Sequence, residues 1–222
     1  MRRFLRDNGL SLVLTALFIV TLLGQSVTGH HYHNSEQRDH RQPEVSYTEY
    51  LASPSFLEAT MENWESEFFQ MGIFVIFTAY LFQRGSAESK DPDETDDPVD
   101  RVPDPSREGA PGPVRRGGAL LWLYAHSLSL SLLALFLVTF VLHAVGGAGE
   151  FNEDQAMHGQ SERVTTWSYM TTSRFWFESL QNWQSEFLSI AVMVVFTIWL
   201  RQHGSPESKP VDAPHSQTGS GD

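Results

Sequence analysis

The sequence predicts an all-α integral membrane protein, built from two tandem helical hairpins with four transmembrane helices. Long apolar segments alternate with strongly polar ones along its 222 residues, which is the pattern of a membrane protein with soluble loops. Residues 63–68 (Asn-Trp-Glu-Ser-Glu-Phe) recur as residues 182–187 (Asn-Trp-Gln-Ser-Glu-Phe). Each copy leads into an apolar run that closes at a matched tail, residues 85–90 or residues 204–209. A duplicated hairpin unit explains all three observations.

The first hairpin is expected at residues 1–85, with spans at about 10–27 and 64–83. Three arginines precede the first span, and this basic start followed by an apolar core also fits a signal peptide. However, no small-x-small cleavage site follows clearly, and the same apolar pattern recurs deep inside the chain. We therefore expect a retained helix.

The second and fourth spans hold only about fifteen strongly apolar residues each, whereas a membrane crossing needs about 20. We therefore expect each of these helices to begin earlier, inside the preceding acidic stretch. Ser55 and Glu58 have the spacing of a capping box, and Ser173 is a weaker cap candidate in the second copy. Gly85 and Gly204 suit the left-handed conformation that ends a helix.

The second hairpin is expected at residues 117–204, with spans at about 120–143 and 183–201. Between the hairpins, residues 86–116 combine many acidic residues with many prolines. This composition cannot bury a core, so a disordered acidic linker is predicted. The tail at residues 205–222 has the same character and receives the same prediction.

The distribution of Lys and Arg predicts the orientation in the membrane. Eleven of the fifteen lie in the amino-terminal tip, the central linker or the carboxy-terminal tail. The positive-inside rule therefore places both termini and the linker in the cytoplasm. The two hairpins then have the same orientation, which makes this a parallel duplication, unlike the inverted repeats of many transporters.

Composition excludes several functional classes. A net charge of −12 leaves no basic face for nucleic acid. The absence of cysteine excludes disulfides and thiolate chemistry. Residues 30–33 (His-His-Tyr-His) resemble a metal-binding tract, but no partner motif with metal spacing accompanies them, and a solvated loop is preferred. No catalytic motif or convincing nucleophile–base set is present, so we expect neither enzyme activity, nor a metal, nor a cofactor.

A polar stripe marks the outer end of each even-numbered span. Its residues recur at helical spacing and share one helix face. Glu67 is expected about one turn inside the membrane, where an ionised carboxylate costs a few kcal/mol unless it is paired, wetted or protonated. Gln25 and His143 are expected at the same depth on the odd-numbered spans. The candidate polar cluster therefore comprises Gln25, Asn63, Ser66, Glu67, His143, Asn182, Ser185 and Glu186.

Such a cluster could carry a proton or bind a cation, because two nearby carboxylates and an imidazole tune one another. A purely structural alternative remains open. Glu near a helix start is favoured by the helix dipole, and Asn and Ser satisfy free backbone donors. Under this alternative, Trp64 and Trp183 are ordinary anchors at the membrane interface.

Three motifs together resemble a family of small bacterial four-span membrane proteins described only as a domain of unknown function. They are the two hexapeptides, the two Gly-Ser-x-Glu-Ser-Lys tails, and the start at residues 2–12 (Arg-Arg-Phe-Leu-Arg-Asp-Asn-Gly-Leu-Ser-Leu). The resemblance covers almost the whole chain outside the acidic linker. It implies a bacterial origin and a multi-pass location in the cytoplasmic membrane. It implies no activity, ligand or catalytic residue.

Two functional hypotheses follow. The first is a non-enzymatic integral membrane protein that acts by interaction or by organising the envelope. The second is a small proton- or cation-coupled transporter or channel that uses Glu67 and Glu186. The lipid bilayer is the predicted partner, and the sequence leaves open a membrane-protein partner or a homodimer.

Overall fold

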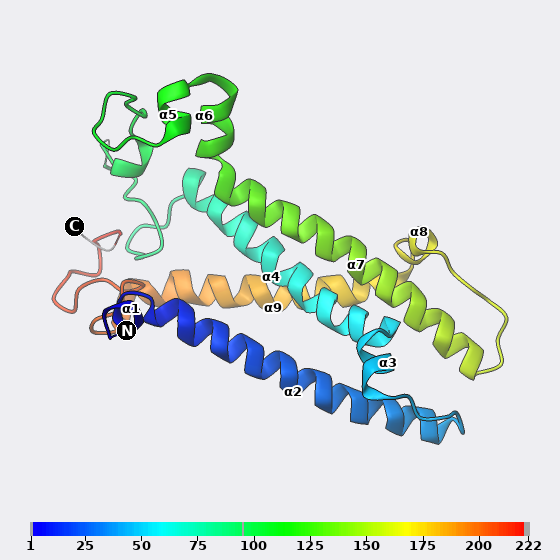
Figure 1. Ribbon diagram of the computed structural model, residues 1–222. Coiled ribbons are helices and arrows are strands. Elements are labelled where there is room, and N and C mark those ends of the chain that lie inside the picture. Colours follow the sequence, from blue (N-terminus) through cyan, green and yellow to red (C-terminus); the bar gives the residue numbers. More distant parts are fainter. Residues whose placement is uncertain (1, 95, 220–222) are drawn as a thin grey trace. The chain divides into compact units, whose positions relative to one another are not determined.

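The computed structural model describes residues 2–94 and 96–219, and every regular element within them is a helix (Figure 1). The prediction of an all-helical fold is therefore confirmed. Four helices are long: α2 (Gly9–Asp39), α4 (Pro54–Tyr80), α7 (Ser127–Met157) and α9 (Ser173–Trp199). The short ones are α1 (Arg2–Asp7), α3 (Tyr47–Leu51), the 3₁₀ helix η1 (Pro98–Asp100), α5 (Gly112–Arg116), α6 (Gly118–Ala125) and α8 (Thr166–Tyr169).

Among the described residues, α2 and α7 are long and apolar enough to cross a membrane, with mean hydropathies of 2.1 and 2.4 in their most apolar windows. Only 6% of that window is buried in α2 and 22% in α7. The core helix of a soluble protein would bury most of such a surface. These two helices are therefore consistent with association with a membrane.

The second long helix begins inside the acidic stretch, as expected, because α4 starts at Pro54. The predicted cap is wrong, however. The Ser53 hydroxyl accepts a hydrogen bond from the Phe56 backbone N–H at 3.2 Å, so Ser55 lies inside the helix and does not cap it. Proline is favoured at the first helical position because it lacks an N–H. Its presence at position 54 makes the residue before it the cap.

The fourth long helix starts in a similar way. The Thr172 hydroxyl accepts from the Phe175 backbone N–H at 3.3 Å, and α9 begins at Ser173. Ser173 is therefore the first helical residue and not the cap. The one complete capping box that the described helices show lies at α3, where Ser46 and Glu49 exchange hydrogen bonds.

Gly85 and Gly204 adopt the predicted left-handed conformation, with φ of +86° and +82°. They do not cap the long helices, because α4 ends at Tyr80 and α9 ends at Trp199. Each glycine instead lies in a turn beyond the helix. The sequence prediction was right about the backbone conformation and wrong about the place where the helix ends.

Two further boundaries differ from the prediction. The expected span at 120–143 is interrupted at His126, between α6 and α7, where the ring nitrogen Nδ1 contacts the Trp122 carbonyl oxygen at 2.8 Å. Residues 30–33 lie in α2, which continues to Asp39, and not in a solvated loop. The polar residues that follow the apolar run therefore extend the first long helix.

The chain divides into two compact units. Unit 1 comprises Met1–Glu62 and Phe140–Trp176, and unit 2 comprises Asn63–Thr139 and Phe177–Asp222. Helices α4, α7 and α9 contribute residues to both.

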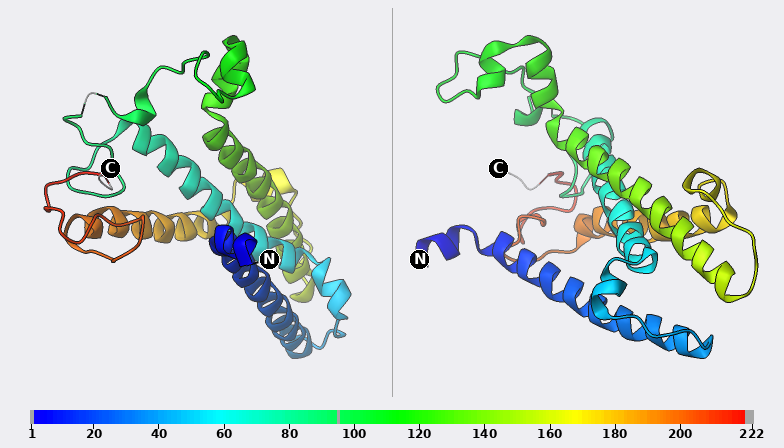
Figure 2. Two further views of the ribbon diagram at one scale, coloured as in Figure 1. Left: turned by 60° about the vertical axis from the view of Figure 1, so that its left-hand side comes forward. Right: turned by 45° about the vertical axis from the view of Figure 1, so that its right-hand side comes forward.

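In unit 1, two short helices dock through tyrosines onto glycines of the long helices. Helix α3 lies against the second half of α2 (Figures 1 and 2). A Cβ added at Gly29 would lie 2.1 Å from the Tyr50 hydroxyl oxygen, and one added at Gly147 would lie 2.4 Å from Cε1 of Tyr169. Both tyrosines are buried. Glycine is therefore required at both positions for the tyrosine rings to fit.

Each of these short helices is preceded by a segment held by an asparagine of the long helix. Asn34 accepts from the Val45 N–H at 2.9 Å and donates to the Val45 carbonyl at 3.0 Å. Asn152 makes the same two bonds with Val164, at 2.8 and 2.9 Å. The same local arrangement thus occurs twice, with equivalent residues of the two sequence copies.

The core of unit 1 lies where α7 approaches the first residues of α4 and α9. A Cβ added at Gly146 would lie 2.5 Å from the backbone nitrogen of Glu58, and one added at Gly149 would lie 2.6 Å from Pro54 Cβ. The backbones therefore approach closely. The buried hydrophobic side chains here are Ala144, Ala148, Tyr169 and Phe175.

The acidic linker carries specific local contacts. Lys90 Nζ donates to the Ala79 carbonyl at 3.1 Å and to the Asp100 carboxylate at 2.8 Å, and Arg84 pairs with Asp93 at 2.7 Å. The structure describes turns and the 3₁₀ helix η1 in this segment. Disorder of the linker stays a prediction.

Candidate functional site

The two glutamates singled out by the sequence come together within unit 2. Glu67 lies on α4 and Glu186 on α9, and their carboxyl groups are close enough for the charge of Glu67 to act on Glu186. The Gln70 side chain also donates to the Glu186 backbone carbonyl at 3.5 Å. Glu186 is half-buried and Glu67 is exposed. The pair is therefore exposed to the surroundings of the protein on the side of Glu67.

An aromatic cluster holds α4, α7 and α9 together beside this pair. The Phe69 ring lies 4.5 Å from Trp183, 4.8 Å from Phe136 and 5.7 Å from Phe187, between ring centroids. Pairs at such distances stabilise by about 0.5–1.5 kcal/mol beyond the area they bury. The pair of glutamates is therefore fixed to packed helices rather than to loops.

Glu65 is the buried carboxylate of this region, and sequence reasoning missed it. Its side chain is fully buried, and the Trp183 indole N–H donates to it at 3.0 Å. Glu67 recurs in the second hexapeptide as Glu186, whereas the counterpart of Glu65 is Gln184, so recurrence did not indicate Glu65. Helical spacing could have revealed Glu65, since it shares a face with Phe69 and Gly72. Trp183 therefore packs within unit 2 and is not simply an interface anchor.

Three hydrogen bonds of the Asn and Ser residues of the stripe each lie within a single helix. Ser66 donates to the Asn63 carbonyl at 2.8 Å, and Ser185 donates to the Asn182 carbonyl at 2.8 Å. Asn182 also donates to the Glu178 carbonyl at 3.3 Å. In these bonds the side chains donate to backbone carbonyl groups, so they are not the bonds to free backbone N–H donors that the structural alternative predicted. They do not involve the carboxylate pair.

The last two residues of the predicted cluster lie in unit 1. Gln25 donates to the Thr60 hydroxyl at 3.4 Å, which joins α2 to α4. His143 is fully buried, with its ring centroid 4.9 Å from that of Phe175. The cluster is therefore distributed over both units, and its assembly into one site stays a prediction.

Unit 1 also contains a buried ionic group that the sequence did not indicate. Glu58 is 7% exposed, and one of its carboxylate oxygens lies within 4.8 Å of a ring nitrogen of His143. Arg174 lies 3.7 Å from Glu58 and 4.0 Å from Glu150. Burying a carboxylate is costly unless it is paired, and Arg174 provides that pairing.

The histidine tract contributes to packing. The His30 ring nitrogen Nε2 lies 2.8 Å from the Val45 carbonyl oxygen and 2.9 Å from the Asn34 amide nitrogen. The His33 ring lies 5.6 Å from that of Tyr50. These contacts attach the segment before α3 to α2, which is a structural role.

The two matched tails fold in the same way. The Gln83 backbone N–H donates to the Ser89 hydroxyl at 2.8 Å, and the Gln202 N–H donates to the Ser208 hydroxyl at 2.9 Å. Lys209, whose side chain is almost fully buried, donates to the carbonyls of Gly85, His215 and Gln217. The tails therefore form turns held by specific hydrogen bonds, and they do more than end the preceding helices.

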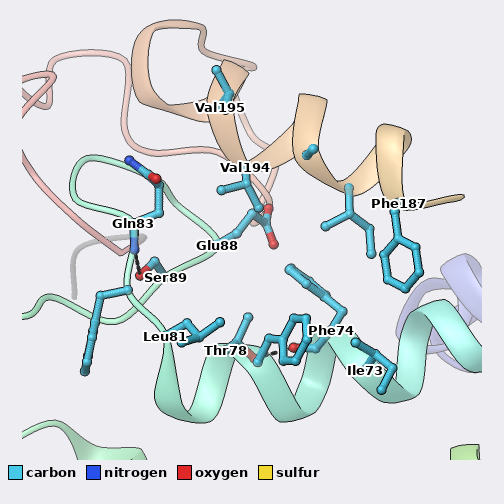
Figure 3. Close-up of a pocket in the computed structure, with 14 residues that line it drawn as sticks. Ile73, Phe74, Thr78, Leu81, Gln83, Glu88, Ser89, Phe187, Val194 and Val195 are labelled. Atoms are coloured by element: carbon cyan, nitrogen blue, oxygen red, sulfur yellow. Dashed lines mark hydrogen bonds between the residues drawn. The ribbon is translucent and has the colours of Figure 1, made fainter. Parts of the chain in front are cut away.

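Beside the first tail, a groove of about 320 Å³ runs between α4 and α9 within unit 2 (Figure 3). Its walls are apolar, and polar side chains gather near the tail, where Glu88 reaches between the helices. Its volume falls at the small end of the roughly 300–1,000 Å³ that is typical of ligand pockets.

Comparison with known proteins gives one result. A family described as "Domain of unknown function (DUF6766)" matches residues 1–220. No curated protein and no solved structure matches the chain.

Proposed function

We propose that this chain, which belongs to the DUF6766 family of unknown function, is a multi-pass membrane protein that binds and passes a proton or a monovalent cation at Glu67 and Glu186. One observation supports this role: the two carboxyl groups interact across α4 and α9, which pack together through Phe69, Trp183 and Phe187. Two carboxylates this close both stay ionised when a cation lies between them, and otherwise they share a proton.

The membrane arrangement is part of the proposal. Four spans in two parallel hairpins, with cytoplasmic termini, are supported by the length and apolar surface of α2 and α7 and by the distribution of Lys and Arg. The lengths of α4 and α9, 27 residues each, are enough to cross a bilayer. The equivalent bonds of Asn34 and Asn152 support the duplication. A bacterial cytoplasmic membrane is the proposed location.

The depth of the glutamates makes a functional role physically reasonable. An ionised carboxylate costs about 2.5–3.5 kcal/mol at the centre of a membrane helix on insertion scales, and less at the depth expected for Glu67, about one turn inside the boundary. Ionisable residues inside membranes therefore face a bundle or water, and they mark ion pathways. The open side at Glu67 gives a proton or cation a way to reach the pair.

Reconstitution tests this function. The purified chain is placed in vesicles that hold a dye sensitive to protons, sodium or potassium, and the gradient of the matching ion is imposed. We expect wild-type flux for one of these ions and the rate of empty vesicles for the double variant Glu67→Gln, Glu186→Gln. The matched control is Glu162→Gln, a loop residue that is exposed.

The opposite result favours the other functional class. A wild-type chain that folds but passes none of the three ions would refute the transport proposal. The protein would then be assigned to interaction or envelope organisation, and a pull-down with its membrane neighbours would identify the partner. A reporter fused after Lys90 separates a wrong topology from a wrong function, since it should be active only in the cytoplasm.

A further inference from the structure

The groove between α4 and α9 is apolar along most of its length. Ile73 and Phe74 line it from α4, and Phe187 and Val194 line it from α9 (Figure 3). Phe77 and Ile190 line it as well. No carboxylate of the Glu67–Glu186 pair lines this groove, so it is a separate feature from the proposed ion site. A surface of this kind holds a hydrocarbon chain because burying apolar area is favourable.

One charged side chain reaches into this groove. Ser86 is fully buried and its hydroxyl lies 3.0 Å from the Thr197 hydroxyl of α9. The Ala87 N–H donates to the same Thr197 hydroxyl at 3.3 Å, and the Glu88 N–H donates to Ser86 at 3.1 Å. These bonds attach the tail to α9. Because the backbone is fixed on both sides, the Glu88 side chain is directed between the helices.

Among the residues that the structure describes, no Lys, Arg or His forms an ion pair with the Glu88 carboxylate. Its Oε1 atom is buried and has no hydrogen-bond partner within the described part of the chain. Burial raises the pKa of this carboxyl, and the negative charge of Glu207 adds to the effect. The basic side chains of the two tails bind elsewhere: Arg84 to Asp93, Lys90 to Asp100, and Lys209 to three carbonyls.

We propose that this groove binds an amphiphile with a single hydrocarbon tail and a cationic ammonium head, and that the head pairs with Glu88. The tail replaces water or lipid along the phenylalanine and valine walls. The ammonium group supplies the hydrogen bond and the charge that the buried carboxylate oxygen lacks. An amphiphile with an uncharged alcohol head would fill the same walls and could donate one hydrogen bond to that oxygen, but it would bring no positive charge to the carboxylate.

Photolabelling of the full chain in phosphatidylcholine nanodiscs tests this proposal. The probes are a dodecylamine and a dodecanol that each carry a diazirine at the same carbon, and labelled peptides are located by mass spectrometry. We expect the amine to label peptides that contain residues 73–82 and 187–195. Its labelling should exceed that of the alcohol by about tenfold, which is the effect of one charge-assisted hydrogen bond.

Three variants separate the contribution of the Glu88 carboxylate to probe binding from that of the apolar walls. Glu88→Gln should bring amine labelling down to the level of the alcohol, which should stay unchanged. Glu207→Gln removes the equivalent carboxylate of the second tail, which does not line the groove, and should retain most of the labelling. Ala191→Trp should block both probes by filling the groove.

The proposal is overturned if amine and alcohol label the groove equally in the wild type, because the groove then holds only a neutral lipid chain. It is also overturned if Glu88→Gln leaves the amine preference intact. If Glu88→Gln fails to fold, competition in the wild type decides the question. Unlabelled dodecylamine should displace the amine probe, and dodecanol at the same concentration should not.

Discussion

The close approach of α7 to the start of α4 in unit 1 gives a quantitative prediction for Gly146→Ala. The new Cβ would lie 2.5 Å from the Glu58 backbone nitrogen and 2.8 Å from its Cα. Ordinary contacts between carbon atoms are about 3.5–4.0 Å. Both contacted atoms belong to the backbone, so a helix must shift, and overpacking of this kind costs about 1–3 kcal/mol.

The same substitution also has a favourable effect that must be subtracted. Alanine is about 1 kcal/mol better than glycine inside a helix. Gly24→Ala measures this gain alone, because nothing lies within 4 Å of the position where its Cβ would be placed. Gly146→Ala should therefore be less stable than Gly24→Ala by about 1–3 kcal/mol.

The assay is unfolding of each purified variant by SDS in mixed micelles, followed by far-ultraviolet circular dichroism. The free energies of unfolding of the two variants are compared with that of the wild type in the same experiment. Equal shifts for Gly146→Ala and Gly24→Ala would refute the close helix contact. A stabilised Gly146→Ala variant would refute it as well.

Two other predictions concern a helix cap and a buried carboxylate. Ser46→Ala should lower the free energy of unfolding by about 1 kcal/mol, because it removes the cap of α3. Hydrogen bonds from Ser46 lower the pKa of the Glu49 carboxyl in the folded protein. The stability that these bonds contribute should therefore be present above the pKa of Glu49 in the unfolded chain and be lost as the pH falls through its pKa in the folded protein. If the free energies of unfolding of wild type and variant differ by the same amount at every pH, this prediction is contradicted. Trp183→Phe should cost about 1.5–3 kcal/mol, because it removes a donor to the buried Glu65. The exposed Trp167 provides the control Trp167→Phe, and equal stability losses in the two variants would argue against the Glu65 contact.

Part of this structure was predictable because it depends on local rules. Apolar length and periodicity predicted the long helices, and the need for about 20 residues predicted that α4 begins before its apolar run. The left-handed conformation of Gly85 and Gly204 followed from the freedom of glycine. The proximity of Glu67 and Glu186 was expected because they occupy the same place in the two recurring hexapeptides.

Other features depend on tertiary contacts that a single sequence does not contain. The histidines of α2 stay helical because Asn34 and His30 bind the Val45 segment that follows the helix. The buried Glu65 accepts a hydrogen bond from Trp183 of the other hexapeptide, which offsets part of the cost of burying its carboxylate. In both cases the partner is distant along the chain, so neither pattern nor propensity could identify it.

A double-mutant cycle on ion flux tests the central claim most directly. Flux into vesicles is measured for the wild type, Glu67→Gln, Glu186→Gln and the double variant, with folding checked by circular dichroism. If the two carboxyl groups form one site, each single change should remove nearly all of the flux and the double change should remove no more, because residues that act as a unit are not additive. Wild-type flux in both single variants, or independent effects that multiply in the double variant, would contradict the claim.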